Sequence, residues 1–309
     1  MPNETTTTFD GAGRSTASTV YSLGAQRFTT TTGYLGADRT DSTPPAGGTP
    51  TSVYTNALGQ QTSLVQYLAA TPNTSATTET TTYAYNAQGK MTGMVDPAGN
   101  HWSWGFDVLG HQITATDADT GTTSSSYDDA GNLLTSTDAR GTTLAYTYDA
   151  LNRKTGEYTG SSSGAKLAGW TFDTIYKGQP TASTSYTGSV PGTPGAAYTS
   201  TITGYDNGYR PTGSTVSIPA GAPAFGGTSY ATTYLYYLSG DISSTTYPAE
   251  GGLASERVRS LYDNAGLVTS LSGTSSIASG VFYTGINQVA QIKRDATASL
   301  AHPAWCARL

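Results

Sequence analysis

Residues 127–153 read YDDAGNLLTSTDARGTTLAYTYDALNR, which is one complete repeat followed by the start of the next. Four aromatic residues open successive units: Tyr85, Phe106, Tyr127 and Tyr148. The first step is 106 − 85 = 21 positions, and the next two steps give the same difference. A fixed period over several units is typical of a repeat array, in which each unit contacts mainly its neighbours. The sequence therefore predicts an extended array rather than a fold built around one cleft.

Each unit also carries two turn signals. In the unit that begins at Tyr127, the first is Asp128 with Gly131 and the second is Asp138 with Gly141. Asp side chains cap tight turns, and Gly accepts the positive φ that ends such a turn in a bulge. Two turns in one period leave two strands of roughly six to eight residues. One unit is therefore predicted to be one β-hairpin.

The strand that leads into an aromatic turn shows the two-residue period of a half-buried strand. Trp102, Trp104 and Phe106 alternate with Ser103 and Gly105, which predicts a strand with one aromatic face. The chain has 37 Gly and 22 Tyr among 309 residues, a composition that suits strands and turns better than helices. We predict an all-β array of paired hairpins.

The array is predicted to run nearly end to end. Residues 1–300 are interpreted as degenerate and regular repeats, with the best match over 83–158, and residues 301–309 as a non-repeat tail that is disordered or truncated. The wider gaps hold Gly, Pro, Ser and Thr runs, such as 40–51 and 188–195, which suit loops inserted at turns. The chain is interpreted as a fragment of a larger protein or as the product of a truncated reading frame.

The charge balance argues against a nucleic-acid-binding role. The chain has 15 Lys and Arg against 21 Asp and Glu, a net charge of −6, and no basic cluster interrupts this balance. The single cysteine, Cys306, excludes an internal disulfide framework. No apolar run reaches membrane-spanning length, and no N-terminal signal peptide is recognisable. Any secretion is expected to be directed from outside this chain.

The chemically reactive residues outside the turns do not form a recognisable active site. His302 and Cys306 lie close in sequence, but nucleophilic catalysis also needs an orienting group and an oxyanion site. His101 and His111 lack a third ligand at metal spacing, and the acidic stretch 117–129 lacks the calcium-loop pattern, so turn capping is favoured there. We expect no enzyme activity, no cofactor and no bound metal. The candidate site residues are structural repeat positions: Tyr85, Gly89, Asp96, Gly99, Phe106, Asp107, Gly110, Asp117, Tyr127, Asp128, Gly131, Asp138, Gly141, Tyr148, Asp149 and Asn152.

The unit closely resembles the YD repeat of Rhs proteins. The resemblance is carried by YDDAGNL at 127–133, DARG at 138–141 and YTYDALNR at 146–153. Similar repeats occur in the C component of insecticidal Tc toxins and in animal teneurins. The resemblance implies a β-sheet that spirals into a hollow β-shell. In the toxin relatives the shell surrounds a toxin or toxic cargo until delivery, and in teneurins it is an extracellular adhesion scaffold.

The resemblance therefore predicts a non-catalytic β-shell segment that encapsulates and helps to deliver a C-terminal toxin in competition between bacteria. The expected partner is a toxin domain or cargo of the same polypeptide or operon. The expected location is outside the cell or on its surface, as part of a larger protein. An extracellular adhesion or carbohydrate-binding scaffold is the alternative, and a remnant of a truncated gene is a third. Open sheet edges could also pair with another copy of the chain.

Overall fold

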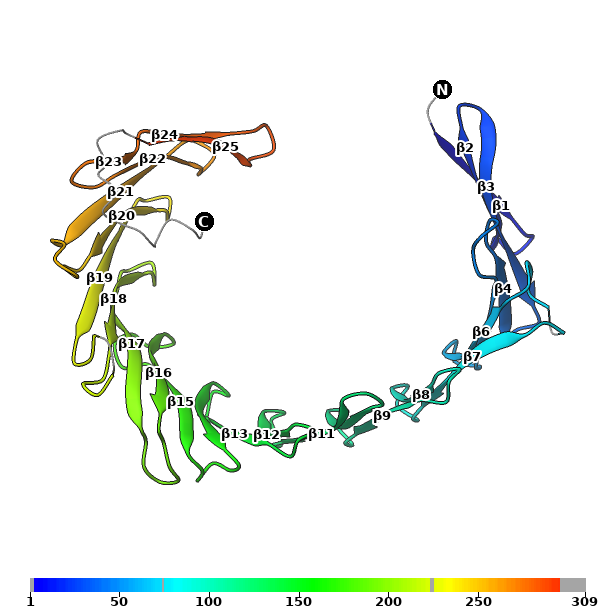
Figure 1. The fold of residues 1–309 in the computed structure, drawn as a ribbon, viewed down its shortest axis with the longest axis horizontal. Helices are drawn as coiled ribbons and strands as arrows, with labels where there is room; N and C mark the ends of the chain where they lie inside the picture. The colour runs from blue at the N-terminus through cyan, green and yellow to red at the C-terminus, as the bar shows by residue number, and fades with distance from the viewer. Residues whose placement is uncertain (1–2, 74, 223–224, 295–309) are drawn as a thin grey trace. The chain divides into compact units, whose positions relative to one another are not determined.

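The computed structural model describes residues 3–73, 75–222 and 225–294. Every regular element in these residues is a β-strand (Figure 1). The strands are β1 (Glu4–Phe9), β2 (Ser15–Ser22), β3 (Ala25–Leu35), β4 (Arg39–Thr43), β5 (Thr51–Thr55), β6 (Gln61–Tyr67), β7 (Thr78–Tyr85), β8 (Met91–Val95), β9 (His101–Phe106), β10 (Gln112–Asp117), β11 (Gly121–Tyr127), β12 (Leu133–Thr137), β13 (Thr143–Tyr148), β14 (Lys154–Thr159), β15 (Lys166–Phe172), β16 (Pro180–Thr187), β17 (Ala196–Tyr205), β18 (Pro211–Ser217), β19 (Ser229–Tyr236), β20 (Ile242–Tyr247), β21 (Glu256–Tyr262), β22 (Val268–Ser272), β23 (Ser276–Ala278), β24 (Gly280–Tyr283) and β25 (Val289–Lys293).

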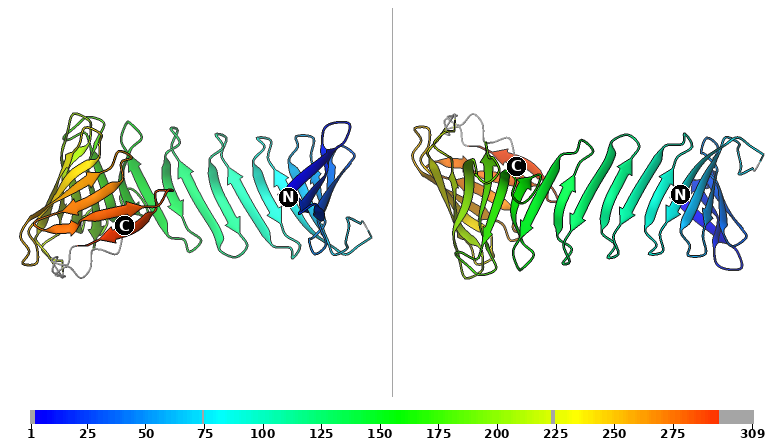
Figure 2. Two further views of the ribbon diagram at one scale, coloured as in Figure 1. Left: turned by 90° about the horizontal axis from the view of Figure 1, so that it is seen from above. Right: turned by 90° about the horizontal axis from the view of Figure 1, so that it is seen from below.

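Strands β1 to β23 belong to one sheet, and β24 pairs with β25 in a second, two-stranded sheet. Strands that follow one another in the chain lie next to one another in antiparallel pairs, as β8 with β9 and β9 with β10 show (Figure 2). This connectivity needs only short turns, which is why a sequence dense in turn signals can build it. The prediction of an all-β array of hairpins is confirmed.

The chain divides into two compact units, Met1–Thr143 and Leu144–Leu309. The first unit holds β1 to β12, and the second holds β14 to β25. Strand β13 begins at the last residue of the first unit and lies otherwise in the second. Within each unit the same hairpin pattern continues from strand to strand.

One register recurs at most of the joints between hairpins. We call the turn that follows an aromatic residue at the end of a strand an aromatic turn, and the residue directly after its last Gly or Asn the turn-closing residue. Lys90 closes one such turn and His111 closes the next. At these joints the third residue after a turn-closing residue faces the third residue before the next aromatic residue, whereas the joint of β16 and β17 is shifted by one, so that Ala182 faces Thr201. Gly93 thus faces Ser103 in one repeat, and Thr114 faces Ser124 in the following one. The repeat period in the sequence is therefore also a fixed geometric step in the sheet.

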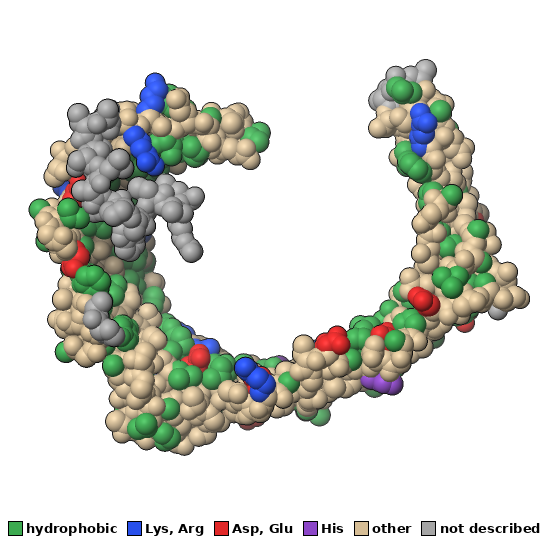
Figure 3. Space-filling model, in the orientation of Figure 1, with side chains coloured by type: hydrophobic (Ala, Val, Ile, Leu, Met, Phe, Trp, Pro, Cys, Tyr) green, Lys and Arg blue, Asp and Glu red, His purple; other side chains and the backbone are tan. Residues whose placement is uncertain are grey.

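The sheet is a single layer with little enclosed core. Among the described residues, the buried ones are Pro50, Ser52, Tyr67, Ala145, Gly156, Gly169, Thr181, Gly213, Ser244, Ala278 and Gly280. In an ordinary domain a second layer would bury one face of the sheet. Here side chains are covered mainly by neighbours on the same face, and cross-strand hydroxyl pairs such as Thr116 with Thr122 at 3.0 Å add to the pairing. The side of the molecule drawn in Figure 3 carries few charged side chains and scattered apolar ones.

Candidate functional site: a ladder of aromatic turns

Asp128 organises the turn that follows Tyr127. Its backbone N–H donates to the Asn132 carbonyl oxygen at 3.0 Å, and its carbonyl oxygen accepts from the Gly131 N–H at 3.0 Å. Its carboxylate Oδ1 accepts from the N–H groups of Ala130 at 3.0 Å and of Asn132 at 2.8 Å. Gly131 has a φ of +82°, which residues with a Cβ disfavour, and the strand register shifts next to Tyr127. This geometry fits a short hairpin loop that ends in a glycine bulge.

These hydrogen bonds favour the ionised form of the turn aspartates. The side-chain amide of Asn132, and then its backbone N–H, hold the pKa of Asp128 below its ordinary value of 3.8. At Asp206 the backbone N–H of Arg210 and then its guanidinium lower the pKa in the same way. Hydrogen bonds to a carboxylate stabilise its charged form. The low pKa is thus a property of turn capping and does not require a proton-transfer role.

The structure places the sequence-derived repeat positions in two kinds of turn. Asp107, Asp128 and Asp149 begin turns that follow an aromatic residue, whereas Asp96 and Asp138 begin turns at the other end of the hairpin. The turn-ending residues all have positive φ: Gly89 +79°, Gly99 +85°, Gly110 +86°, Gly131 +82°, Gly141 +79° and Asn152 +61°.

Asp117 forms a different turn from the other aspartates. Its Oδ1 accepts from the N–H groups of Asp119 and Thr120, both at 2.8 Å. Its Oδ2 accepts from the indole Nε1–H of Trp102 at 3.1 Å. Gly121, four residues on, has a φ of +89° and begins the next strand. Asp117 therefore links its own turn to an aromatic side chain on the neighbouring strand β9.

The hydroxyl groups of the turn tyrosines tie each repeat to the preceding one. Tyr85 Oη donates to the carbonyl oxygen of Gln61 at 2.8 Å, and Tyr127 Oη donates to that of Gln112 at 3.2 Å. The acceptor in each case is the first residue after the preceding turn-closing residue. Five further bonds follow the same rule: Tyr34 to Ser15, Tyr205 to Pro180, Tyr236 to Pro211, Tyr262 to Ile242 and Tyr283 to Val268. We call this series the hydroxyl ladder.

The sequence predicts strands with one aromatic face but does not predict the hydroxyl ladder. The sequence does contain a signal for the hydroxyl ladder. Tyr outnumbers Phe by 22 to 6, and packing of the rings alone would not favour Tyr over Phe. Phe106 and Phe172 hold the same strand-end position in β9 and β15 without a hydroxyl. The acceptor could not be found from sequence, since it is a backbone carbonyl on another strand.

The turn-closing residue lies against the next aromatic ring. Where it is Arg or Lys, its cationic group lies over the ring, an arrangement that stabilises by about 0.5–1 kcal/mol at exposed sites. The distances from the cationic group to the ring centroid are 4.2 Å for Arg14 over Tyr34, 5.2 Å for Lys90 over Phe106, 4.4 Å for Arg153 over Phe172 and 4.6 Å for Arg210 over Tyr236. His111 takes this position above Tyr127, with ring centroids 4.8 Å apart, and its Nδ1 lies 2.9 Å from Asp107 Oδ2.

Side chains also connect one turn directly to the next. Arg153 lies 2.7 Å from Asp149 Oδ2 in its own turn and 2.5 Å from Asp173 Oδ2 in the following turn. The Arg153 guanidinium, with the Gly178 N–H second, lowers the pKa of Asp173 to about 2. In the first unit Gln60 Nε2 donates to the carbonyl oxygen of the next turn glycine at 3.0 Å. Direct side-chain contacts thus link some neighbouring turns in both units.

A serine close to a carboxylate lies in β5 but is not a nucleophile. Ser52 Oγ donates to Asp41 Oδ1 at 2.5 Å and lies 2.9 Å from Tyr67 Oη, while Arg39 holds both oxygens of Asp41. The exposed fraction of Ser52 is 0%, so no substrate can reach it. Buried polar groups of this kind are stabilised by full hydrogen bonding. We interpret the cluster as structural.

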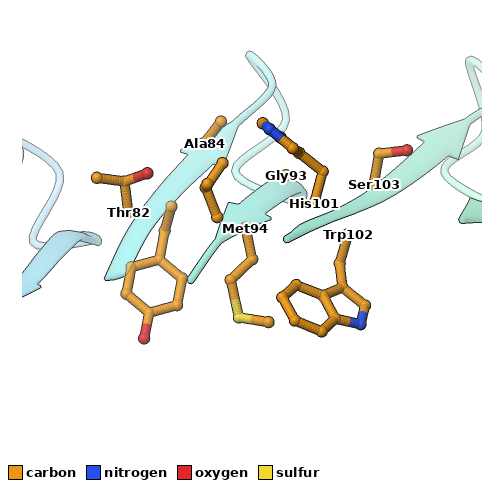
Figure 4. Close-up of a pocket in the computed structure, with 9 residues that line it drawn as sticks. Thr82, Ala84, Gly93, Met94, His101, Trp102 and Ser103 are labelled. Atoms are coloured by element: carbon orange, nitrogen blue, oxygen red, sulfur yellow. The ribbon is translucent and has the colours of Figure 1, made fainter. Parts of the chain in front are cut away.

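A shallow cavity of about 240 Å³ lies along β7, β8 and β9 (Figure 4). Tyr83 faces Met94, and Met94 faces Trp102, across the neighbouring strands. Figure 4 shows Met94 and Trp102 on one side of the strands and His101 and Ser103 on the other. The cavity brings apolar side chains together without a cluster of titratable groups.

Other kinds of site are not found in the part of the chain that the structure describes. No group of three or more His, Cys, Asp or Glu side chains in residues 3–73, 75–222 and 225–294 is placed to hold a metal ion. None of these residues forms a helix long and apolar enough to cross a membrane. His302, Cys306 and the predicted tail lie outside the described residues.

The sequence model of the RHS Repeat family matches residues 68–101 and 127–163. These two stretches are therefore similar to RHS repeats. The matched stretches include the turns after Tyr85, Tyr127 and Tyr148, which belong to the ladder of aromatic turns. The exact period continues through Phe106, between the two matches. No curated protein matches the sequence.

Solved structures share the fold of this chain. The TcdB2–TccC3 structure superposes with a TM-score of 0.62 at 15% identity, covering 94% of this chain and 16% of that one. The TcdB2–TccC3–Cdc42 structure gives a TM-score of 0.61 at 15% identity, with the same coverage of both chains. The Tc holotoxin pore of Photorhabdus luminescens gives 0.60 at 15% identity, covering 94% of this chain and 15% of that one. The chain thus spans about a sixth of the length of these proteins.

Proposed function

We propose that this chain is a non-catalytic wall segment of an RHS-type protein, whose larger whole encloses a toxin and helps to deliver it to another cell. The observation that carries the proposal is the ladder of aromatic turns. Its contacts join each hairpin to the next in a sheet that is one layer thick. Both faces of this sheet are free to contact other molecules. Such a sheet separates two spaces, whereas an enzyme needs converging groups in one cleft. The likeness to toxin-complex structures supports the same conclusion at the level of fold.

The partner that follows from this proposal is a toxin domain or cargo encoded in the same polypeptide or operon. The working location would be outside the producing cell or on its surface, as part of the larger protein. The strands carry few charges, which suits a wall because such strands neither attract nor repel a highly charged cargo strongly. The sixteen repeat positions named from the sequence would then serve to hold the wall together.

Protease protection in the longer parent protein tests the proposal. We expect the cargo of the intact parent to resist a protease that digests the isolated cargo. Deletion of residues 107–117, which removes one turn and β10, should open the wall and make the cargo cleavable. The control is Tyr83→Phe, because the Tyr83 hydroxyl makes no hydrogen bond among the described residues and its loss should leave protection intact. Equal digestion of cargo in the intact parent and in isolation would contradict the proposal.

A second candidate function is carbohydrate binding at the cavity of β7 to β9. Tyr83 and Trp102 flank Met94 there, and aromatic rings with an apolar body and a polar tip suit surfaces that are partly wet. Saturable binding on a glycan array that is lost in Trp102→Ala and retained in Trp170→Ala would favour this function. Binding to no glycan would leave the wall as the sole candidate.

A further inference from the structure

Strand β21 carries two arginines on one face of the sheet. Arg257 and Arg259 are both exposed, whereas Glu256 and Val258, which alternate with them, are half-buried. Side chains two residues apart in a strand point to the same face, so the two arginines are neighbours on that face. None of the ion pairs between described side chains involves either of them. Two positive charges thus lie side by side without a counter-charge from the part of the chain that the structure describes.

This arrangement differs from that of the arginines elsewhere in the repeats. Arg14, Arg39, Arg140, Arg153 and Arg210 each lie 2.7 or 2.8 Å from an aspartate oxygen. Those guanidinium groups are neutralised within the sheet and its turns. The two arginines of β21 are left to interact with a ligand.

Hydroxyl side chains lie beside the two arginines on the neighbouring strands (Figure 1). Thr246 of β20 faces Arg257, while Ser244 of β20 and Ser272 of β22 face Arg259 from its two sides. The Arg257 Nε–H donates to Ser244 Oγ at 2.9 Å, and Ser244 is only 1% exposed. A buried group that faces Arg259 therefore fixes the position of the Arg257 guanidinium. Two like charges held close together repel each other, and an anion between them would remove this repulsion.

The acidic residues closest in sequence are engaged elsewhere. Glu256 belongs to the opposite face of β21, and its Oε1 accepts from the Thr274 N–H at 3.0 Å and hydroxyl at 3.2 Å. Asp263 Oδ1 caps its own turn by accepting from the Ala265 N–H at 2.8 Å. Each carboxylate thus has hydrogen-bond donors of its own, so an anion for the two arginines has to come from a ligand.

A phosphate monoester is the anion that fits these groups. It carries a charge of about −1.5 to −2 at pH 7 and three acceptor oxygens, which match two arginines with hydroxyl donors beside them. Guanidinium groups bind such oxygens through two parallel hydrogen bonds. A carboxylate or a sulfate ester carries a single negative charge and would leave one arginine without a partner.

Two apolar side chains on the same face suit the organic part of such an ester. Leu235 of β19 faces Ser244, and Leu261 is two residues beyond Arg259 on β21. They are 51% and 53% exposed. Burial of this apolar surface against carbon atoms of a ligand would be favourable. An organic phosphate therefore fits the face better than inorganic phosphate does.

We propose that Arg257 and Arg259 form a binding site for a soluble organic phosphate monoester. The phosphate lies between the two guanidinium groups, with Thr246 and Ser272 as hydroxyl donors at its sides. The ester's organic part lies against Leu235 or Leu261. The site does not depend on what the wall encloses.

Calorimetric titration of the full chain with phenyl phosphate at low ionic strength tests the site. We expect saturable one-to-one binding that is tighter than the binding of inorganic phosphate. Arg257→Gln and Arg259→Gln should each weaken it at least about tenfold, because each variant removes charge-assisted hydrogen bonds. Arg27→Gln is the matched control, since Arg27 is also an exposed strand arginine without an ion pair among the described residues. Its binding should be unchanged.

Arg259→Lys separates a built site from general attraction between opposite charges. Lysine keeps the positive charge but lacks the planar fork, so we expect binding to weaken severalfold. Unchanged binding in this variant, equal weakening in Arg27→Gln, or no saturation with phenyl phosphate would overturn the proposal. Vesicles that contain phosphatidic acid present the same phosphate group on a lipid. Binding to these vesicles without binding to phenyl phosphate would overturn the assignment of a soluble ligand.

Discussion

At the residue scale, the repeat uses three side chains for three separate tasks. Asp128 satisfies the N–H groups of its turn, Gly131 accepts the positive φ, and Tyr127 carries the bond to the preceding strand. Each task has a distinct physical requirement, so the three residue types are not interchangeable. This division explains why the pattern of aromatic, Asp and Gly is recognisable in sequence.

Replacement of Gly131 by Val should destabilise the protein by roughly 1–2 kcal/mol, because a β-branched residue resists a φ of +82°. An added Cβ would also lie 3.1 Å from His111 Nε2, which is tight. The measurement is the free energy of unfolding in denaturant. Gly11→Val is the control, because Gly11 has no positive φ and no heavy atom near its Cβ position, so it should change stability little. An unchanged Gly131→Val variant would contradict the role of this position.

Replacement of Tyr236 by Phe should cost about 1 kcal/mol, the net value of a typical hydrogen bond. It removes the 2.7 Å bond from Tyr236 Oη to the Pro211 carbonyl oxygen while retaining the ring. The change in melting temperature measures the effect. Tyr83→Phe, which removes a hydroxyl outside the ladder, should leave the melting temperature unchanged. Equal shifts in the two variants would show that the hydroxyl ladder contributes nothing.

At the element scale, the hairpin is stabilised by its joints to the two neighbouring hairpins. Each joint combines backbone pairing with turn-to-turn contacts, and their composition varies. The joint before Phe172 has no tyrosine hydroxyl, but there Arg153 holds Asp149 and Asp173 together. The joint before Tyr236 uses both the hydroxyl and Arg210 over the ring. Different residues thus perform the same function of coupling one hairpin to the next.

The Arg153 joint should depend on pH in the acid range. The pKa of Asp173 is lowered to about 2 from 3.8, so folding favours its ionised form. Its contribution to stability is present above pH 3.8 and is lost as the pH falls toward about 2. Asp173→Asn should therefore have a lower melting temperature than the parent chain at about pH 5, and the gap should narrow on acidification. Arg140→Gln, at an exposed ion pair, is expected to show a much smaller gap. A gap that stays constant with pH would contradict this role of Asp173.

At the scale of the whole molecule, a repeat array tolerates changes that preserve its period. Nearest-neighbour contacts dominate in such arrays, so removing one full unit leaves the remaining joints intact. The deletion must keep the alternation between strands that lead into an aromatic turn and strands that follow one. A half-unit deletion would place two strands that lead into aromatic turns next to each other in the chain, so that their side-chain facing and strand direction would not match those of a normal joint.

Deletion of residues 107–127, which joins Phe106 to Asp128, should give a folded all-β protein with only a small change in melting temperature. The matched half-unit deletion of residues 107–117 should lose cooperativity or aggregate, because it exposes unpaired edges. Circular dichroism and scanning calorimetry provide the measurements. Equal behaviour of the two deletions would show that the period is not the structural unit.

The sequence alone determined the all-β array, the hairpin unit and the turn types, because Asp, Gly and aromatic residues act over a few neighbouring positions and repeat at a fixed interval. The positive φ of Gly110 and Asn152 falls where that pattern requires a turn. Only the tertiary structure revealed the hydroxyl ladder, the cations over the rings and the Arg153 contact to Asp173, which join residues 15 to 26 positions apart. These contacts depend on strand register and on backbone acceptors that have no residue-type signature.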